Sequence, residues 1–111
     1  MNIALIGYGK MGKSIEKLAI ERGHNISAVV DLDNQEKLFE LSPNNTDVAI
    51  EFSNPSSAFH NIAACLRQKV PVISGTTGWL NKLSDIEALC TTHNGTFLTT
   101  SNFSLGVNIF F

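Results

Sequence analysis

The stretch IALIGYGKMG at residues 3–12 decides the fold. Its first four residues are an apolar run, typical of a buried strand, and glycines follow at positions 7, 9 and 12. The next apolar residues have helical spacing: Met11, Ile15, Leu18 and Ala19. In a dinucleotide-binding turn, the first glycine permits the tight turn, the second lets a pyrophosphate approach the backbone, and the third lets the helix pack on the strand. The stretch therefore predicts a nucleotide-binding strand, turn and helix.

The rest of the chain repeats this alternation of strand and helix. Further strands are predicted at residues 26–30, 47–52, 70–74 and 96–100. The first helix is expected to end at Gly23, the second to start with Asn54 as cap and Pro55 at its first position, and the third to bury Leu83 and Ile86. The segment 32–46 predicts only a short helix at 35–41 and a loop. Alternating strands and helices predict an α/β fold, a doubly wound parallel sheet of the Rossmann type, in one domain over residues 1–111.

Composition excludes several classes of protein. The chain has 111 residues, a net charge of −2 and no run of Lys or Arg, so we expect no nucleic-acid partner. Cys65 and Cys90 form no CxxC pair and are interpreted as reduced cytosolic thiols packed as small core residues. No secretory signal or membrane-length apolar stretch is present, and no metal site is predicted, so we expect a cytoplasmic protein with no membrane partner.

Asp31 supports the nucleotide interpretation. It lies 19 residues after Gly12 at the end of the second predicted strand, where an acid accepts hydrogen bonds from the adenosine ribose hydroxyls. The alternatives are an ordinary strand-to-helix turn at the glycines and a plain turn acid at Asp31. Asp33 competes for the ribose role but sits two residues further out. The glycines and Asp31 together favour a nicotinamide dinucleotide.

Two further motifs follow the fourth and fifth predicted strands. Gly75-Thr76-Thr77-Gly78 combines glycines that let a flat ring approach with hydroxyls that can donate to a carboxamide or carboxylate. The second motif, Thr100-Ser101-Asn102-Phe103-Ser104, falls on the same edge of the sheet. Taken alone, the first could be a turn and the second a plain loop.

The glycine turn, Glu51-Phe52-Ser53-Asn54-Pro55, residues 75–78 and Ser101–Asn108 together resemble dihydrodipicolinate reductase. The resemblance covers nearly the whole chain. Family enzymes are longer, and their second, substrate and catalytic domain should begin about where this chain stops. The apolar terminus Val107, Ile109, Phe110 and Phe111 also looks like the start of an element meant to be buried.

The resemblance implies hydride transfer from NADH or NADPH to a cyclic dihydrodipicolinate-type dicarboxylate in diaminopimelate and lysine biosynthesis, by a homo-oligomeric enzyme. It implies cofactor binding by Gly7, Tyr8, Gly9, Lys10, Met11 and Gly12, by Asp31, by Gly75, Thr76 and Thr77, and by Thr100, Ser101, Asn102 and Phe103. Thr77 would also lie near a substrate carboxylate. The family's catalytic His and Lys lie in the second domain, so no catalytic residue is assigned here, and His24, His60 and His93 are expected to face solvent. The chain alone is expected to be inactive.

NADH is the expected preference, with NADPH also accepted. An NADPH site offers Arg or Lys after the second strand to hold the ribose phosphate, whereas this chain offers Asp31 and Asp33. Lys37 is expected on another element, and Lys10 could offset part of the repulsion. Two other interpretations stay open: the cofactor domain of another amino-acid-pathway dehydrogenase, such as aspartate or homoserine dehydrogenase, and a stand-alone NAD(H) sensor. The sequence that follows residue 111 would discriminate between them.

Overall fold

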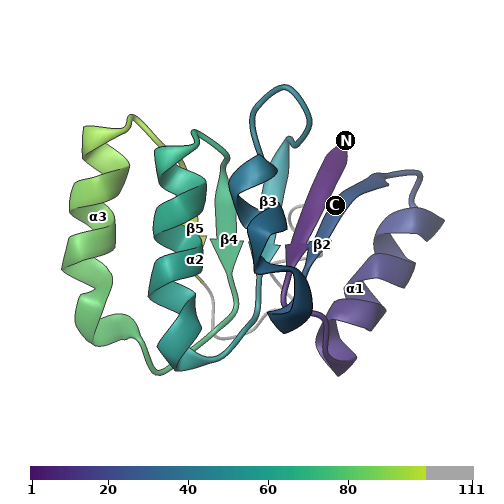
Figure 1. Cartoon of the computed structure of the whole chain (residues 1–111), viewed down its shortest axis with the longest axis horizontal. Helices are drawn as coiled ribbons and strands as arrows, with labels where there is room; N and C mark the ends of the chain where they lie inside the picture. The colour runs from purple at the N-terminus through teal and green to yellow at the C-terminus, as the bar shows by residue number, and fades with distance from the viewer. Residues whose placement is uncertain (100–111) are drawn as a thin grey trace.

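The structure is a computed structural model that describes residues 1–99, apart from the side chain of Leu32. Five parallel strands form one sheet in the order β2-β1-β3-β4-β5 (Figure 1). The strands are β1 (Asn2–Ile6), β2 (Asn25–Val30), β3 (Val48–Glu51), β4 (Val72–Ser74) and β5 (Phe97–Thr99). The helices are α1 (Lys10–Glu21), α2 (Pro55–Arg67) and α3 (Leu83–Thr92), with 3-10 helices η1 (Leu32–Glu40) and η2 (Leu80–Lys82). The predicted α/β fold of Rossmann type is confirmed.

Helices cover both faces of the sheet because side chains alternate along each strand. In β1, Ile3 and Leu5 pack with Ile15 and Ala19 of α1 on one face. Ala4 and Ile6 belong to the second cluster, which faces α2, α3 and η1. Figure 1 shows α1 set apart from α2 and α3 accordingly. No helix in residues 1–99 is long and apolar enough to cross a membrane.

The helix boundaries follow local chemistry. The Asn54 side chain accepts a hydrogen bond from the Ser57 backbone N–H, and Pro55 begins α2, as predicted. Gly23 follows the C-cap of α1 with φ of +82°, a conformation that glycine adopts without steric cost.

Two sequence predictions are wrong in detail. Met11 was expected on the inner face of the first helix, but it is 46% exposed, and Gly12 occupies the inward position of that turn. The reason is the close approach of α1 to the sheet, which leaves room for no side chain there. The short helix expected at residues 35–41 is the longer 3-10 segment η1, which is kinked at Asn34.

The strand order reverses direction at β1. Its neighbours are β2 on one side and β3 on the other, so the chain leaves the carboxyl ends of β1 and β3 toward opposite faces of the sheet. Parallel sheets bind ligands in the crevice that this reversal opens. The fold therefore locates the candidate site at the carboxyl ends of β1, β2 and β3.

The two cysteine thiols are expected to differ in reactivity. Burial and the nearby Glu51 carboxylate raise the pKa of the fully buried Cys65 thiol to about 12. Cys90 is half-buried, and its thiol donates to the Gly95 carbonyl. Since the thiolate is the nucleophile, iodoacetamide at pH 8 should label Cys90 and leave Cys65 unmodified in the folded chain. Peptide mass mapping with and without urea checks this, and equal labelling of both native thiols would contradict the packing described.

Candidate functional site

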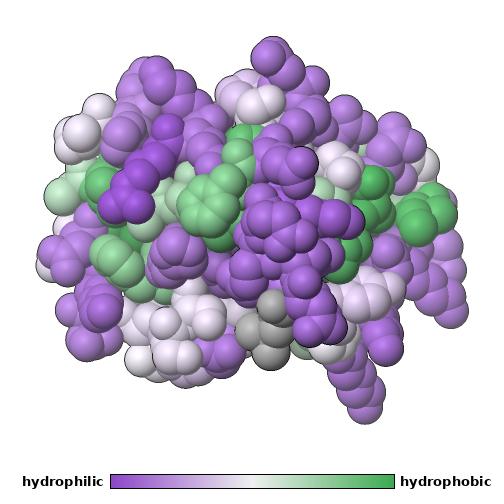
Figure 2. Space-filling model, in the orientation of Figure 1, coloured by the Kyte–Doolittle hydropathy of each residue, from purple (hydrophilic) through white to green (hydrophobic). Residues whose placement is uncertain are grey.

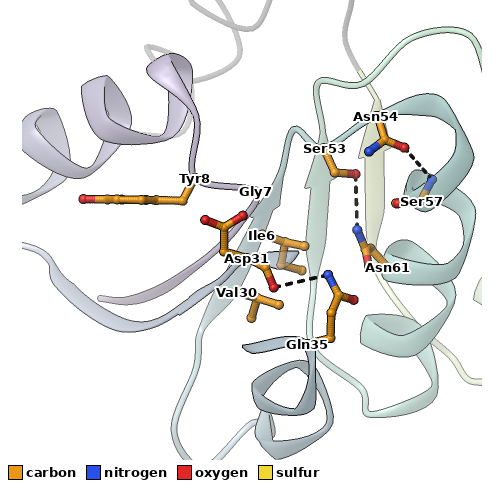
Figure 3. Close-up of a pocket in the computed structure, with 10 residues that line it drawn as sticks. All are labelled: Ile6, Gly7, Tyr8, Val30, Asp31, Gln35, Ser53, Asn54, Ser57 and Asn61. Carbon is orange, nitrogen blue, oxygen red and sulfur yellow. Dashed lines mark hydrogen bonds between the residues drawn. The ribbon is translucent and has the colours of Figure 1, made fainter. Parts of the chain in front are cut away.

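A cavity of about 150 Å³ opens at the carboxyl edge of the sheet (Figure 3). Its walls come from the ends of β1 and β2, from η1, and from the β3–α2 loop with the first turns of α2. The lining residues are Ile6, Gly7, Tyr8, Val30, Asp31, Gln35, Ser53, Asn54, Ser57 and Asn61. Sites that enclose a drug-sized ligand have volumes of roughly 300–1,000 Å³. This cavity is therefore suited to one moiety of a dinucleotide rather than to the whole molecule.

Packing explains two of the three glycines in the turn. Gly7 has φ of +100°, and a Cβ there would lie 2.7 Å from the Phe52 carbonyl oxygen. A Cβ on Gly12 would lie 2.7 Å from the Phe52 ring and 2.8 Å from the Gly7 carbonyl oxygen. Real Cβ atoms do not approach neighbours this closely. Gly7 and Gly12 are therefore required by the contact between α1 and the sheet.

Gly9 is different, because a Cβ built on it meets nothing within 4 Å. It is the N-cap of α1, with no side-chain cap and no acidic residue in the first helical turn. The first backbone N–H groups of a helix lack intrahelical partners and carry a partial positive charge. Such a terminus favours a phosphate, and the open space at Gly9 lets one approach.

Hydrogen bonds to its backbone hold Asp31 at the wall of the cavity. Its N–H donates to Asn34 Oδ1 at 2.6 Å, and Asn34 Nδ2 in turn donates to the Val29 carbonyl at 3.1 Å. Gln35 Nε2 donates to the Asp31 carbonyl at 3.3 Å, as Figure 3 shows. The half-buried Asp31 side chain lines the cavity, whereas Asp33 is exposed and does not.

Tyr8 is anchored beside the cavity by α1. Its hydroxyl donates to Glu16 Oε1 at 2.6 Å, and Lys13 Nζ lies 5.7 Å from the ring centroid. The hydrogen bond to Glu16 is the main cause that raises the pKa of Tyr8 above its usual value. The Tyr8 hydroxyl is therefore committed to Glu16, and in Figure 3 the ring extends away from the other residues that line the cavity.

A fully buried carboxylate, Glu51, joins two loops of the site. Glu51 Oε2 accepts from the Ser53 backbone N–H at 2.8 Å, from the Ser53 hydroxyl, and from Thr76 Oγ1 at 2.8 Å. Glu51 Oε1 accepts from Ser74 Oγ at 2.7 Å. The Thr76 carbonyl accepts from the buried Trp79 indole at 2.7 Å. Four donors compensate for the loss of water around the buried carboxylate, and they tie the β3–α2 loop to the β4–η2 loop.

Sequence reasoning did not assign Glu51 a role. The available signal was an acid at the end of the apolar run at residues 48–50, where a charged group requires partners to be buried. Ser53, Asn54, Ser57, Asn61 and Gln35 were also not predicted to line the site. They come together only through the packing of α2 and η1 against the same sheet edge.

The predicted loop at residues 75–78 lies at the carboxyl end of β4, outside the cavity lining. Gly75 N–H donates to the Glu51 backbone carbonyl at 2.7 Å, which holds the loop to β3. Thr76 is 6% exposed and commits its hydroxyl to Glu51, while Thr77 and Gly78 are exposed. Thr76 therefore anchors this loop to Glu51, and Thr77 offers the accessible hydroxyl.

The remaining predicted residues divide into three groups. Lys10 and Met11 are exposed at the start of α1 and do not line the cavity. Thr100, Ser101, Asn102 and Phe103 lie outside the described residues. The three histidines lie away from the cavity lining: the exposed His60 packs edge-on against Phe39, and the half-buried His24 contacts the N-terminal amine.

Known proteins resemble both the sequence and the fold. Residues 1–103 match the family described as dihydrodipicolinate reductase, N-terminus. The chain belongs to this family. The 4-hydroxy-tetrahydrodipicolinate reductase of Christiangramia forsetii is 47% identical over 111 residues, which are 100% of this chain and 46% of that protein. The same enzyme of Staphylococcus haemolyticus is 35% identical over 116 residues, covering 97% of this chain and 46% of the relative. The chain thus spans less than half the length of these relatives.

Solved structures share the fold at low sequence identity. A homoserine dehydrogenase from Archaeoglobus fulgidus aligns with a TM-score of 0.70 at 16% identity, over 89% of this chain and 42% of its own. A hyperthermophilic archaeal homoserine dehydrogenase in complex with NADPH aligns with a TM-score of 0.69 at 14% identity, over 88% and 43% of the two chains. These likenesses show a common fold, whereas the matching residues 1–103 show the reductase family.

The Glu51 network predicts a graded response to substitution. Glu51→Leu leaves the Ser53 N–H and three hydroxyls without their acceptor and should lower the free energy of unfolding by about 3 kcal/mol or more. Glu51→Gln can keep an oxygen at the Oε2 position, while the Ser74 hydroxyl turns to accept from the amide, so it should cost roughly 1 kcal/mol. Urea unfolding of both variants measures the difference. Equal stability of the two variants would show that the network does not stabilise the fold.

Proposed function

We propose that this chain is the cofactor-binding domain of a reductase that passes a hydride from NADH or NADPH to a cyclic dihydrodipicolinate-type dicarboxylate, in diaminopimelate and lysine biosynthesis. The observation that carries the proposal is the cavity between the Gly7 turn and Asp31, located where the strand order reverses, in a member of this family. The open space at Gly9 fits a pyrophosphate, because it lies directly before an uncapped helix N-terminus.

The dinucleotide would extend along the carboxyl edge of the sheet. The turn at residues 7–12 would hold the pyrophosphate, and Asp31 would accept hydrogen bonds from the adenosine ribose. Residues 75–77 and 100–103 would surround the nicotinamide, with the exposed Thr77 donating to a carboxylate of the substrate. The bound cofactor supplies the hydride. The proton source and the substrate clamp would belong to a second domain, so this chain alone would bind cofactor without turnover.

Gly9→Val tests the pyrophosphate site. Gly9 has the extended backbone angles φ −87° and ψ −154°, and a Cβ there would enter open space, so the fold should persist while phosphate is blocked. At about 100 times the dissociation constant, NADH should stabilise the wild-type chain by about 2.7 kcal/mol, a rise in melting temperature of roughly 10 °C. Gly9→Val should show little or no rise.

Lys17→Ala, on the exposed side of α1, is the matched control and should respond to NADH as the wild type does. An equal rise in Gly9→Val would remove the turn from the binding site. No rise in the wild type with either NADH or NADPH would refute the proposed function.

NADH should bind more tightly than NADPH. The described residues that line the cavity beside Asp31 include no Lys or Arg, and Lys37 lines a separate depression with Ser27 and Asn45. A phosphate 4 Å from one carboxylate is disfavoured by roughly 1 kcal/mol in water and up to about 4 kcal/mol at the effective dielectric of a protein surface. Paired titrations at one salt concentration measure the ratio, and Asp31→Ser should shift it toward NADPH. Tighter binding of NADPH by the wild type would point to Lys10 as a phosphate contact.

A further inference from the structure

Asn61 has a buried acceptor oxygen that receives no hydrogen bond from residues 1–99. It belongs to α2, is 1% exposed, and lines the cavity opposite Asp31. Within residues 1–99, its Oδ1 is buried without a hydrogen-bond partner, although its Nδ2 donates to Ser53 Oγ at 3.2 Å. Figure 3 shows this amide directed toward Ser53, at the wall of the cavity. A buried acceptor without a donor is costly, so an unpaired oxygen at a cavity wall is a point at which a ligand donor would be favourable.

The orientation of the Asn61 amide is fixed by its neighbours. An ionised carboxylate only accepts hydrogen bonds, so the Ser53 hydroxyl must point its hydrogen at Glu51. Ser53 Oγ is then left to accept, and only the nitrogen of the Asn61 amide can donate to it. The chain of donors from Asn61 through Ser53 to Glu51 thereby turns Asn61 Oδ1 away from Ser53. The buried carboxylate sets which end of the amide is available to a ligand.

We propose that Asn61 Oδ1 accepts a hydrogen bond from the 6-amino group of adenine, so that the cavity selects adenine over a 6-oxo purine. This inference rests on the proposed function, in which the neighbouring Asp31 takes the ribose of the same adenosine. Adenine offers a donor at position 6, and hypoxanthine offers an acceptor that would face the Asn61 oxygen. Ser53 and Glu51 are positioning residues for this contact.

The Gln35 side chain forms part of the cavity wall. It extends into the cavity from η1, and its Nε2 makes only a 3.3 Å hydrogen bond to the Asp31 carbonyl (Figure 3). A rotamer change of this half-buried side chain would break that hydrogen bond and widen the cavity on the η1 side. Adenine binding would then exchange the Gln35 hydrogen bond for a donor to the Asn61 oxygen.

Calorimetric titration of the 111-residue chain with NAD⁺ and with nicotinamide hypoxanthine dinucleotide tests the proposal. The two probes differ in the 6-amino and 6-oxo groups and at the adjacent N1, which carries a hydrogen only in hypoxanthine. A buried acceptor that gains or loses its donor should give a preference of roughly 10-fold or more for NAD⁺. Asn61→Leu, which preserves shape and removes the amide, should bring the ratio of the two affinities close to one.

Ser53→Ala supplies an independent variant. The Ser53 backbone N–H still bonds Glu51, so the fold is retained, but the Asn61 amide loses the partner that fixes its orientation. The preference for NAD⁺ should fall severalfold, while Lys17→Ala should keep the wild-type ratio. If Asn61→Leu fails to fold, the Ser53→Ala ratio decides the question.

The outcomes separate this inference from the function on which it rests. Equal affinity of the wild-type chain for both dinucleotides, or tighter binding of the hypoxanthine analogue, overturns the role of Asn61 and leaves dinucleotide binding intact. An unchanged ratio in Asn61→Leu and Ser53→Ala does the same. Binding of neither dinucleotide overturns both the inference and the proposed function.

Discussion

The rest of the structure depends on the close contact between the start of α1 and the loop after β3. Gly12 packs directly on the Phe52 ring and the Gly7 carbonyl, and Gly7 packs on the Phe52 backbone, with no space for a Cβ at either glycine. This contact seats the helix N-terminus at the carboxyl end of β1. Because strand order reverses beside β1, the same contact leaves a cavity between the turn, Asp31 and the β3–α2 loop.

Glu51 imposes the second constraint, at the end of β3. A carboxylate with no exposure would destabilise the fold without donors, and the chain provides them from β4 and from both adjoining loops. The hydrogen-bond network of Glu51 extends to two parts of the site. Toward α2 the Glu51 network holds Ser53 and Asn61, and toward η2 it holds Thr76, so that the two ends of the proposed dinucleotide site share one buried group. On the face that Figure 2 shows, hydrophilic residues predominate, with apolar patches scattered among them, including over the α2 and α3 side.

Much of the fold could be predicted from the sequence because its signals are local. Apolar runs, the glycine turn and the Asn54-Pro55 start of α2 each act within a few residues, and the structure confirms them. Met11 was misplaced because helical spacing does not show how closely α1 approaches Phe52. The cavity wall could not be predicted, since Gln35 of η1 meets Ser57 and Asn61 of α2 only through packing. The predicted sites at Thr100–Phe103 lie outside the described residues.

The central claim is that the cavity between the glycine turn and Asp31 binds the adenosine half of a nicotinamide dinucleotide. Backbone amide chemical shifts of the ¹⁵N-labelled chain during an NADH titration test it most directly. We expect the largest saturable changes at residues 7–12, at Asp31 and Gln35, and at residues 53–61, with small changes at the far ends of the strands. Changes confined to other surfaces, such as the groove between α3 and β5, or no saturable change, would contradict the claim.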